Sequence, residues 1–152
     1  MNTKNDFINK FYASSMLVAT LADPTNADIF ARIMLAQSAL ETGWGRHIVA
    51  NNMFGIKKLS WLDGSITAMT KEHIEDKMVQ LRQSFQSFSD VTQSFVAYAI
   101  LISQSPRYYK AWQKRSNPIE YFQELQRAGY ATDPDYARKC IAVYNSLPLH
   151  RR

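Results

Sequence analysis

The carboxylate of Glu41 has an unusual setting in this sequence. It ends the apolar segment 29–40, and Thr42-Gly-Trp-Gly45 follows it directly. On a helix its face would also carry Gln37 and Met34, so the carboxyl group would lie at the end of an apolar stripe. Loss of water around a carboxylate raises its pKa, and a carboxyl group that stays protonated near neutrality suits proton donation as a general acid.

A structural interpretation of Glu41 competes with this one. Charged residues are seldom fully buried, so the side chain would in that case simply reach solvent past the apolar stripe. The position is nevertheless unfavourable for a purely structural carboxylate, because the C-terminal end of a helix disfavours anions. The residue pattern alone leaves both interpretations open.

The composition of the chain restricts which proteins could carry such a group. Its 152 residues, 46% hydrophobic and 20% charged, predict one compact domain over residues 1–152 and exclude a disordered or fibrous protein. Cys140 is the single cysteine and fits a helical core position, and the histidines lack metal-site spacing, so we expect neither a metal nor a cofactor. A net charge of +5 favours an anionic partner.

Two N-terminal helices are expected to lead to Glu41. Residues 7–22 carry apolar side chains every three or four positions, at Phe7, Phe11, Ser14, Val18 and Leu21, and Asp23-Pro24 ends that pattern. The basic and apolar residues here also loosely mimic a secretory signal, although Asp6 and two serines weaken that interpretation. Thr25 or Asn26 would cap the second helix, which stops at Gly43. No apolar run is long enough for a membrane span.

The second half of the chain predicts a hairpin followed by further helices. Apolar residues alternate over 66–74 and again over 79–85, which indicates two strands joined near Glu75-Asp76 in a small β lobe at about 60–88. Ser89 would cap the next helix, and prolines mark the first positions of three more, at Pro106, Pro118 and Pro134. The expected fold class is mainly α (α+β), with six helices and one hairpin.

Several ordered motifs resemble one family. The segments are Ala-Gln-Ser-Ala-Leu-Glu-Thr-Gly-Trp-Gly at 36–45, Asn-Asn-Met-Phe-Gly-Ile-Lys at 51–57, Ser-Pro-Arg-Tyr-Tyr at 105–109, and Ala-Gly-Tyr-Ala-Thr-Asp-Pro at 128–134 followed by Tyr-Ala-Arg-Lys at 136–139. They are similar to the motifs of the bacterial endo-β-N-acetylglucosaminidase family. The resemblance implies a lysozyme-like fold, in which a glycan groove separates a helical lobe from a β-hairpin lobe. It also implies that the first helix belongs to the mature domain.

The resemblance assigns roles to two carboxylates. Glu41 matches the essential glutamate of the family and would protonate the leaving oxygen. The second carboxylate lies on the β lobe in this family, and Glu72 is the matching position, with Glu75, Asp76 and Asp63 as competitors. The expected turn lacks the glycine that the family often has, so a register shift would reassign this carboxylate.

Other candidate residues are expected around the groove. Tyr130 matches a tyrosine that the family places near the scissile bond, although a core tyrosine would fit the pattern equally well. Trp44 would either stack on a sugar ring or pack in the core, and its position at a helix end favours packing. The remaining candidates for substrate binding are Asn51, Asn52, Phe54, Lys57, Tyr108 and Tyr109.

The resemblance implies hydrolysis of the β-1,4 bond between N-acetylglucosamine and N-acetylmuramic acid in peptidoglycan glycan strands. The alternatives are a muramidase, a lytic transglycosylase, or a catalytically silent glycan-binding or assembly module. Nucleic-acid binding has only the net charge in its favour, and we do not expect it. The substrate implies work in the periplasm or cell wall. Without a convincing secretory signal, we expect export within a larger protein or by a leaderless route. An antibacterial effector of that kind would require an immunity protein.

Overall fold

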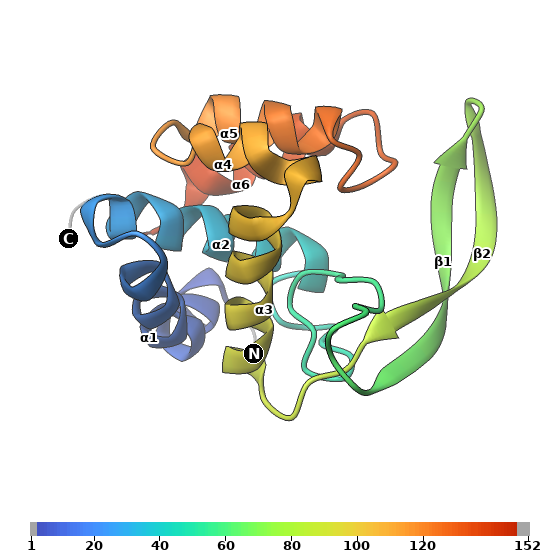
Figure 1. The fold of residues 1–152 in the computed structure, drawn as a ribbon, viewed down its shortest axis with the longest axis horizontal. Helices are drawn as coiled ribbons and strands as arrows, with labels where there is room; N and C mark the ends of the chain where they lie inside the picture. The colour runs from blue at the N-terminus through green and yellow to red at the C-terminus, as the bar shows by residue number, and fades with distance from the viewer. Residues whose placement is uncertain (1–2, 149–152) are drawn as a thin grey trace.

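The structure, a computed structural model, describes residues 3–148 and divides them into a helical lobe and a projecting β hairpin (Figure 1). The helices of this described part are α1 (Lys4–Ala22), α2 (Ala27–Thr42), α3 (Val91–Gln104), α4 (Tyr109–Gln113), α5 (Pro118–Arg127) and α6 (Tyr136–Ser146), with 3-10 turns at Pro24–Asn26 and Pro106–Tyr108. The strands are β1 (Ser65–Ile74) and β2 (Lys77–Gln86). The predicted mainly α fold with a small β lobe is therefore confirmed.

Helix α2 is the central element of the helical lobe and carries Glu41. Helices α1 and α6 pack against it. Its side chains Phe30, Ile33 and Leu35 are completely buried, and full burial of such side chains contributes about 1.5–3 kcal/mol each. The helix ends where Gly43 adopts a left-handed conformation with φ of 58°, which confirms the predicted end. The burial of α2 fixes the position of its last turn.

Helix α1 is formed as the amphipathic pattern predicts, with one difference in its face. Phe7, Phe11 and Val18 are buried as expected. Ser15, and not Ser14, is the buried serine, because its hydroxyl donates to the carbonyl of Ala31 on α2. Leu21 is 76% exposed, since the helix ends beside solvent. Among the helices of residues 3–148, none is both long and apolar enough to cross a bilayer.

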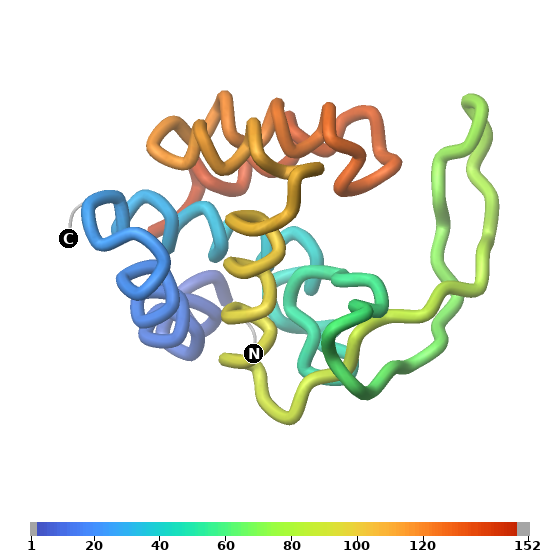
Figure 2. Tube along the Cα trace, viewed as in Figure 1, coloured from blue at the N-terminus to red at the C-terminus, as the bar shows by residue number. Residues whose placement is uncertain are grey.

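The hairpin extends from the helical lobe as a separate two-stranded arm (Figure 2). Strand β1 pairs antiparallel with β2, and Glu72 faces Val79 across the ladder. Glu75 and Asp76 form the turn with φ values of 50° and 64°. These values fit a two-residue type I′ hairpin turn, here built without glycine. The predicted turn and strand parity are therefore confirmed, and the register is the one that keeps Glu72 in phase with Thr70.

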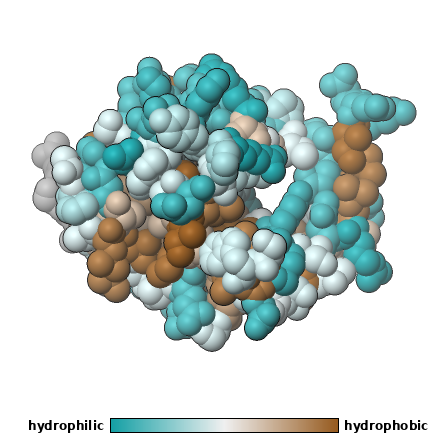
Figure 3. Space-filling model, viewed as in Figure 1, coloured by the Kyte–Doolittle hydropathy of each residue, from teal (hydrophilic) through white to brown (hydrophobic). Residues whose placement is uncertain are grey.

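The two faces of the hairpin differ in exposure. Thr70, Glu72 and Leu81 belong to a half-buried face. Met69 and Met78 are more than half exposed, and Figure 3 shows apolar surface along this arm. The base of the hairpin is anchored by Gln86, whose buried side-chain amide donates to three carbonyls and whose oxygen accepts from the amide of Leu59.

Some helix starts differ from the predictions. Asp90, not Ser89, caps α3, and its carboxylate accepts from the amide of Gln93. Pro118 does begin α5, whereas Pro106 begins a 3-10 turn. Pro134 lies in a turn, and α6 begins two residues later, because the amide of Tyr136 bonds to the carbonyl of Asp133 before the helix forms. Asn26 precedes α2 but makes no side-chain capping bond.

Candidate active site

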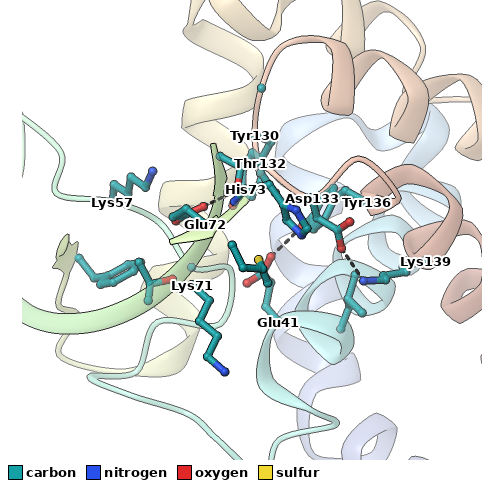
Figure 4. A pocket seen from close by; sticks show the side chains of 17 residues that line it. Glu41, Lys57, Lys71, Glu72, His73, Tyr130, Thr132, Asp133, Tyr136 and Lys139 are labelled. Carbon is teal, nitrogen blue, oxygen red and sulfur yellow. Dashed lines mark hydrogen bonds and ion pairs between the residues drawn. The ribbon is translucent and has the colours of Figure 1, made fainter. Parts of the chain in front are cut away.

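A cavity of about 390 Å³ lies between the hairpin and the helical lobe (Figure 4). Several separate parts of the chain line it. The last turn of α2 contributes Leu40 and Glu41, β1 contributes residues 70–73, and the loop between α5 and α6 contributes residues 129–133. Residues far apart in the sequence therefore meet in one pocket that opens to solvent.

Two contacts fix the Glu41 side chain in this pocket. The hydroxyl of Tyr136 donates to Glu41 Oε1 at 2.9 Å. On the other side, a Cβ atom added to Gly55 would lie 2.8 Å from Glu41 Oε2. Gly55 also has a φ of 62°, a conformation that favours glycine. The carboxyl group is thus held by a hydrogen bond at one oxygen and fits closely against backbone at the other.

The surroundings of Glu41 change its proton affinity. The residue as a whole is solvent-accessible because it opens onto the groove, but protein atoms crowd its carboxyl group. Desolvation is the main cause that raises the pKa of Glu41 to about 7, and the negative charge of Glu72 adds to it. The hydrogen bond from Tyr136 acts in the opposite direction. Glu41 is therefore protonated in a large fraction of molecules near neutrality.

A buried chain of polar side chains supports Tyr136 from behind. The amide nitrogen of Gln37 donates to the Tyr136 hydroxyl at 2.9 Å. The oxygen of the same amide accepts from the hydroxyl of Tyr98, which in turn contacts that of Tyr121. Because Tyr136 accepts from Gln37, its own proton is directed to Glu41. The sequence interpretation gave no role to Gln37 or Tyr136, although a buried glutamine in an apolar stripe must find polar partners.

Glu72 reaches the same pocket from the hairpin. The hydroxyl of Thr132 donates to Glu72 Oε2 at 2.5 Å and accepts from the backbone amide of His73 at 2.9 Å. Thr132 therefore joins the hairpin to the loop that precedes α6. Of the four acidic residues considered for the second carboxylate, Glu72 is the one that lines the pocket with Glu41. Glu75 and Asp76 form the exposed hairpin turn.

Tyr130 also lines the pocket, but it does not contact Glu41 through its hydroxyl. That hydroxyl donates to the carbonyl of Phe54 at 2.6 Å. The ring stacks on Tyr136 with a centroid distance of 6.0 Å and an interplanar angle of 19°. Burial raises the pKa of Tyr130 well above its ordinary range, so it remains a neutral hydroxyl. Its lone pairs stay available to accept a hydrogen bond.

The loop after α2 uses most of its predicted polar groups for its own structure. The side-chain amide of Asn52 donates to the carbonyls of Ile56 and Gln86. Asn51 donates to the carbonyl of Phe88. Phe54 is completely buried and stacks on Tyr98 at 4.3 Å. These contacts hold the loop, and Gly55 within it, against Glu41.

The remaining predicted residues differ in whether they line the pocket of Glu41. Lys57 is exposed and lines the pocket. Tyr108 is buried and lines a neighbouring cavity with Tyr130, whereas Tyr109 is 60% exposed. Trp44 packs edge-on against Phe7 of α1 at 5.6 Å, which is the packing role that its position favoured.

A second cavity, of about 230 Å³, continues the groove on another side of Glu41. Its lining includes His47, Val49, Ile66 and Met69. Within residues 3–148, no group of three or more His, Cys, Asp or Glu side chains is arranged to hold a metal ion. Cys140 is buried, and this burial raises the pKa of its thiol.

Comparisons with known proteins identify the family and several relatives of this chain. The sequence profile of the glucosaminidase family, described as mannosyl-glycoprotein endo-β-N-acetylglucosaminidase, matches residues 22–149. The chain is 38% identical over 148 residues to the peptidoglycan hydrolase FlgJ of Pseudomonas aeruginosa, covering 92% of this chain and 37% of that protein. It is 33% identical over 128 residues to the exo-glucosaminidase LytG of Bacillus subtilis, covering 80% and 45%. The chain thus spans less than half of the length of these relatives.

Solved structures show the same fold. A peptidoglycan hydrolase mutant from Sphingomonas sp. A1 superposes with a TM-score of 0.82 at 31% identity, covering 94% of this chain and 93% of that one. The glycoside hydrolase domain of FlgJ from Salmonella typhimurium gives a TM-score of 0.64 at 27% identity, covering 95% and 88%. The expected lysozyme-like fold is therefore confirmed.

Proposed function

This chain belongs to the glucosaminidase family, and from that premise we propose that it is a glycoside hydrolase of peptidoglycan. The bond proposed is the β-1,4 bond between N-acetylglucosamine and N-acetylmuramic acid. The observation that carries the proposal is the pocket shared by Glu41 and Glu72, in which desolvation raises the pKa of Glu41 to about 7. Family membership and the names of the relatives support the choice of polymer.

Glu41 acts as the general acid in this proposal. Its carboxyl proton passes to the glycosidic oxygen as the bond from that oxygen to the anomeric carbon breaks. Tyr136 donates to Oε1, so Oε2 is the oxygen left to carry the transferable proton. Water supplies a hydroxyl group to the anomeric carbon and a proton to a carboxylate. The products are a new reducing end and a free 4-hydroxyl group.

Glu72 acts as the second carboxylate. Its negative charge stabilises the positive charge that develops on the sugar ring, or it accepts the proton of the attacking water. The hydrogen bond from Thr132 to Oε2 leaves Oε1 for that role. Tyr130 positions the substrate, because its hydroxyl can accept a hydrogen bond from an acetamido N–H while donating to Phe54.

The proposed substrate places the reaction in the periplasm or cell wall. The curated relatives are more than twice as long as the matching region, which supports export as part of a larger protein; a leaderless route is the other proposal. Delivery into competing cells would require a protective partner that binds the groove. A protein encoded beside this chain that inhibits the purified enzyme would support that extension, and its absence would remove it.

Product analysis tests the proposed reaction. Purified sacculi are digested with the wild type and with Glu41→Gln, and the soluble products are reduced and examined by mass spectrometry. Reduced N-acetylglucosamine ends are expected with the wild type alone. Reduced N-acetylmuramic acid ends would identify a muramidase, anhydro ends a lytic transglycosylase, and no release a silent binding module; each result would overturn the proposal.

A further inference from the structure

A third cavity, of about 310 Å³, lies beside the pocket that contains Glu41. The two cavities share Gly55, Lys57, Gly129 and Tyr130 in their linings. Glu41 and Glu72 do not line the third cavity, so it lies outside the bond-breaking centre. A substituent attached to a sugar in the active site could extend into this recess.

The described lining of the recess combines neutral residues with three cations and contains no carboxylate. Lys57, Lys58 and Arg107 contribute to its lining, and none of the described lining residues is Asp or Glu. Arg107 donates to the carbonyls of Ala128 and Gly129 at 2.7 and 2.8 Å. Lys58 donates to the carbonyls of Leu59 and Leu62. These acceptors are neutral, so they orient the two cations without cancelling their charge.

Lys57 is the cation best placed to meet a substrate. Its side chain is exposed, it makes no ion pair among the described residues, and it lines both the active-site pocket and the recess. Figure 4 shows Lys57 and Lys139 on opposite sides of the view, with Glu41 between them. Lys139, unlike Lys57, is paired with Asp133.

The groove is not equally basic around Glu41. The cavity that contains Val49, Ile66 and Met69 has no Lys or Arg in its lining, whereas the recess has three. An uncharged glycan would give no reason for such a concentration of positive charge at one side. A ligand with anionic groups on one side would explain this charge, because a carboxylate that comes close to unpaired cations is attracted to them and binds more tightly.

We infer that this recess binds a carboxylate of the peptide substituent carried by N-acetylmuramic acid, with Lys57 as the main contact. The inference rests on the proposed function, since it extends the substrate from the glycan strand to its peptide. It predicts that the protein distinguishes peptide-bearing from peptide-free glycan by charge. Raised salt should weaken that distinction, because the cations are exposed.

Turnover on paired substrates provides the first test. The ratio of kcat/KM on peptide-bearing strands to kcat/KM on strands from which the peptides have been removed is measured for the wild type and Lys57→Glu. The ratio is expected to fall by up to about fivefold in Lys57→Glu, the upper end of what exposed ion pairs contribute. Lys10→Glu on α1 makes the same change in net charge away from the groove and should leave the ratio unchanged. An equal ratio in Lys57→Glu and the wild type would overturn the inference.

A binding measurement separates this inference from the proposed reaction. Titration calorimetry compares an N-acetylmuramoyl tripeptide with the same compound whose carboxyl groups are amidated. The wild type should bind the free acid several-fold more tightly, and Lys57→Glu should lose that preference. Equal affinity of the wild type for both compounds would contradict the inference whether or not sacculi are cleaved. Failure of cleavage with the preference intact would instead contradict the proposed reaction alone.

Discussion

The two carboxylates of the pocket are held by very different parts of the molecule. Glu41 lies in the last turn of α2, a helix with most of its residues buried, and is held by Tyr136 and the close approach of Gly55. Glu72 lies on a two-stranded arm with one largely exposed face, and Thr132 is its hydrogen-bond partner. Folding of the core thus fixes the first carboxylate, whereas the two hydrogen bonds of Thr132, to Glu72 and from the amide of His73, hold the second against the other lobe.

This difference fits the two chemical roles. A proton donor that works near neutrality needs surroundings that exclude water and keep their geometry. The end of α2 keeps that geometry, because a buried hydrogen-bond chain through Gln37 lies behind Tyr136. A carboxylate that stabilises positive charge or activates water can instead come from an arm that borders the groove. The comparison predicts a larger loss of catalytic activity for changes at Glu41 than for changes at Glu72.

The largest effect is expected for Glu41→Gln. The amide cannot donate a carboxyl proton, so turnover of sacculi should fall about 10³-fold. Circular dichroism and thermal unfolding should show an intact fold, because glutamine has nearly the same shape. Activity within tenfold of the wild type would mean that another group is the acid.

A smaller loss of turnover, about 10²-fold, is expected for Glu72→Gln. Glu75→Gln provides the matched control, since Glu75 lies in the exposed turn of the same hairpin, and it should lose less than twofold. The measurement is the initial rate on sacculi at a fixed pH of 6. A greater loss for Glu75→Gln than for Glu72→Gln would show that the hairpin register places a different carboxylate in the groove.

Tyr136→Phe should reduce kcat about tenfold and also shift the pH dependence. The hydrogen bond from Tyr136 lowers the pKa of Glu41, so its removal should move the alkaline limb of the rate profile to higher pH. Tyr121→Phe removes a hydroxyl from the far end of the same buried chain and should leave that limb in place. If both variants shift the limb equally, the effect is general loosening of the core and not the contact with Glu41.

The smallest effect concerns stability. The pKa of Glu41 is about 7 in the folded protein against an ordinary value of 4.5, so between these values the folded state binds more protons than the unfolded state. The contribution of Glu41 to the free energy of unfolding therefore falls as pH rises from 4.5 to 7. Relative to the wild type, Glu41→Gln should gain thermal stability at pH 8 but not at pH 4. A difference in melting temperature that is the same at both pH values would contradict this.

Local patterns in the sequence predicted much of this arrangement. The apolar stripe of α2 and the glycine at 43 located Glu41, and the alternation along residues 66–74 placed Glu72 on the correct face of its strand. Both signals act over a few residues and depend on periodicity. The starts of α3 and α6 were less accurate, because neighbouring polar residues such as Ser89 and Asp90 can each serve as a cap.

The partners of the two carboxylates could not be predicted in this way. Tyr136 lies 95 residues from Glu41 in the sequence, and Thr132 lies 60 residues from Glu72. Such pairs form only when α6 packs on α2 and when the hairpin meets the loop before α6. The resemblance drew attention to Tyr130, but the packing directs the hydroxyl of Tyr130 to Phe54 and that of Tyr136 to Glu41.

The central claim is that the pocket keeps Glu41 protonated near neutrality. Carbon-13 NMR of the glutamate side-chain carboxyl groups, titrated from pH 3 to 9, measures this directly, and the signal missing from Glu41→Gln identifies the residue. The pKa of Glu41 is expected to be about 7 and to decrease in Glu72→Gln, which removes a neighbouring negative charge. A pKa near the ordinary value of 4.5 in the wild type would contradict the account.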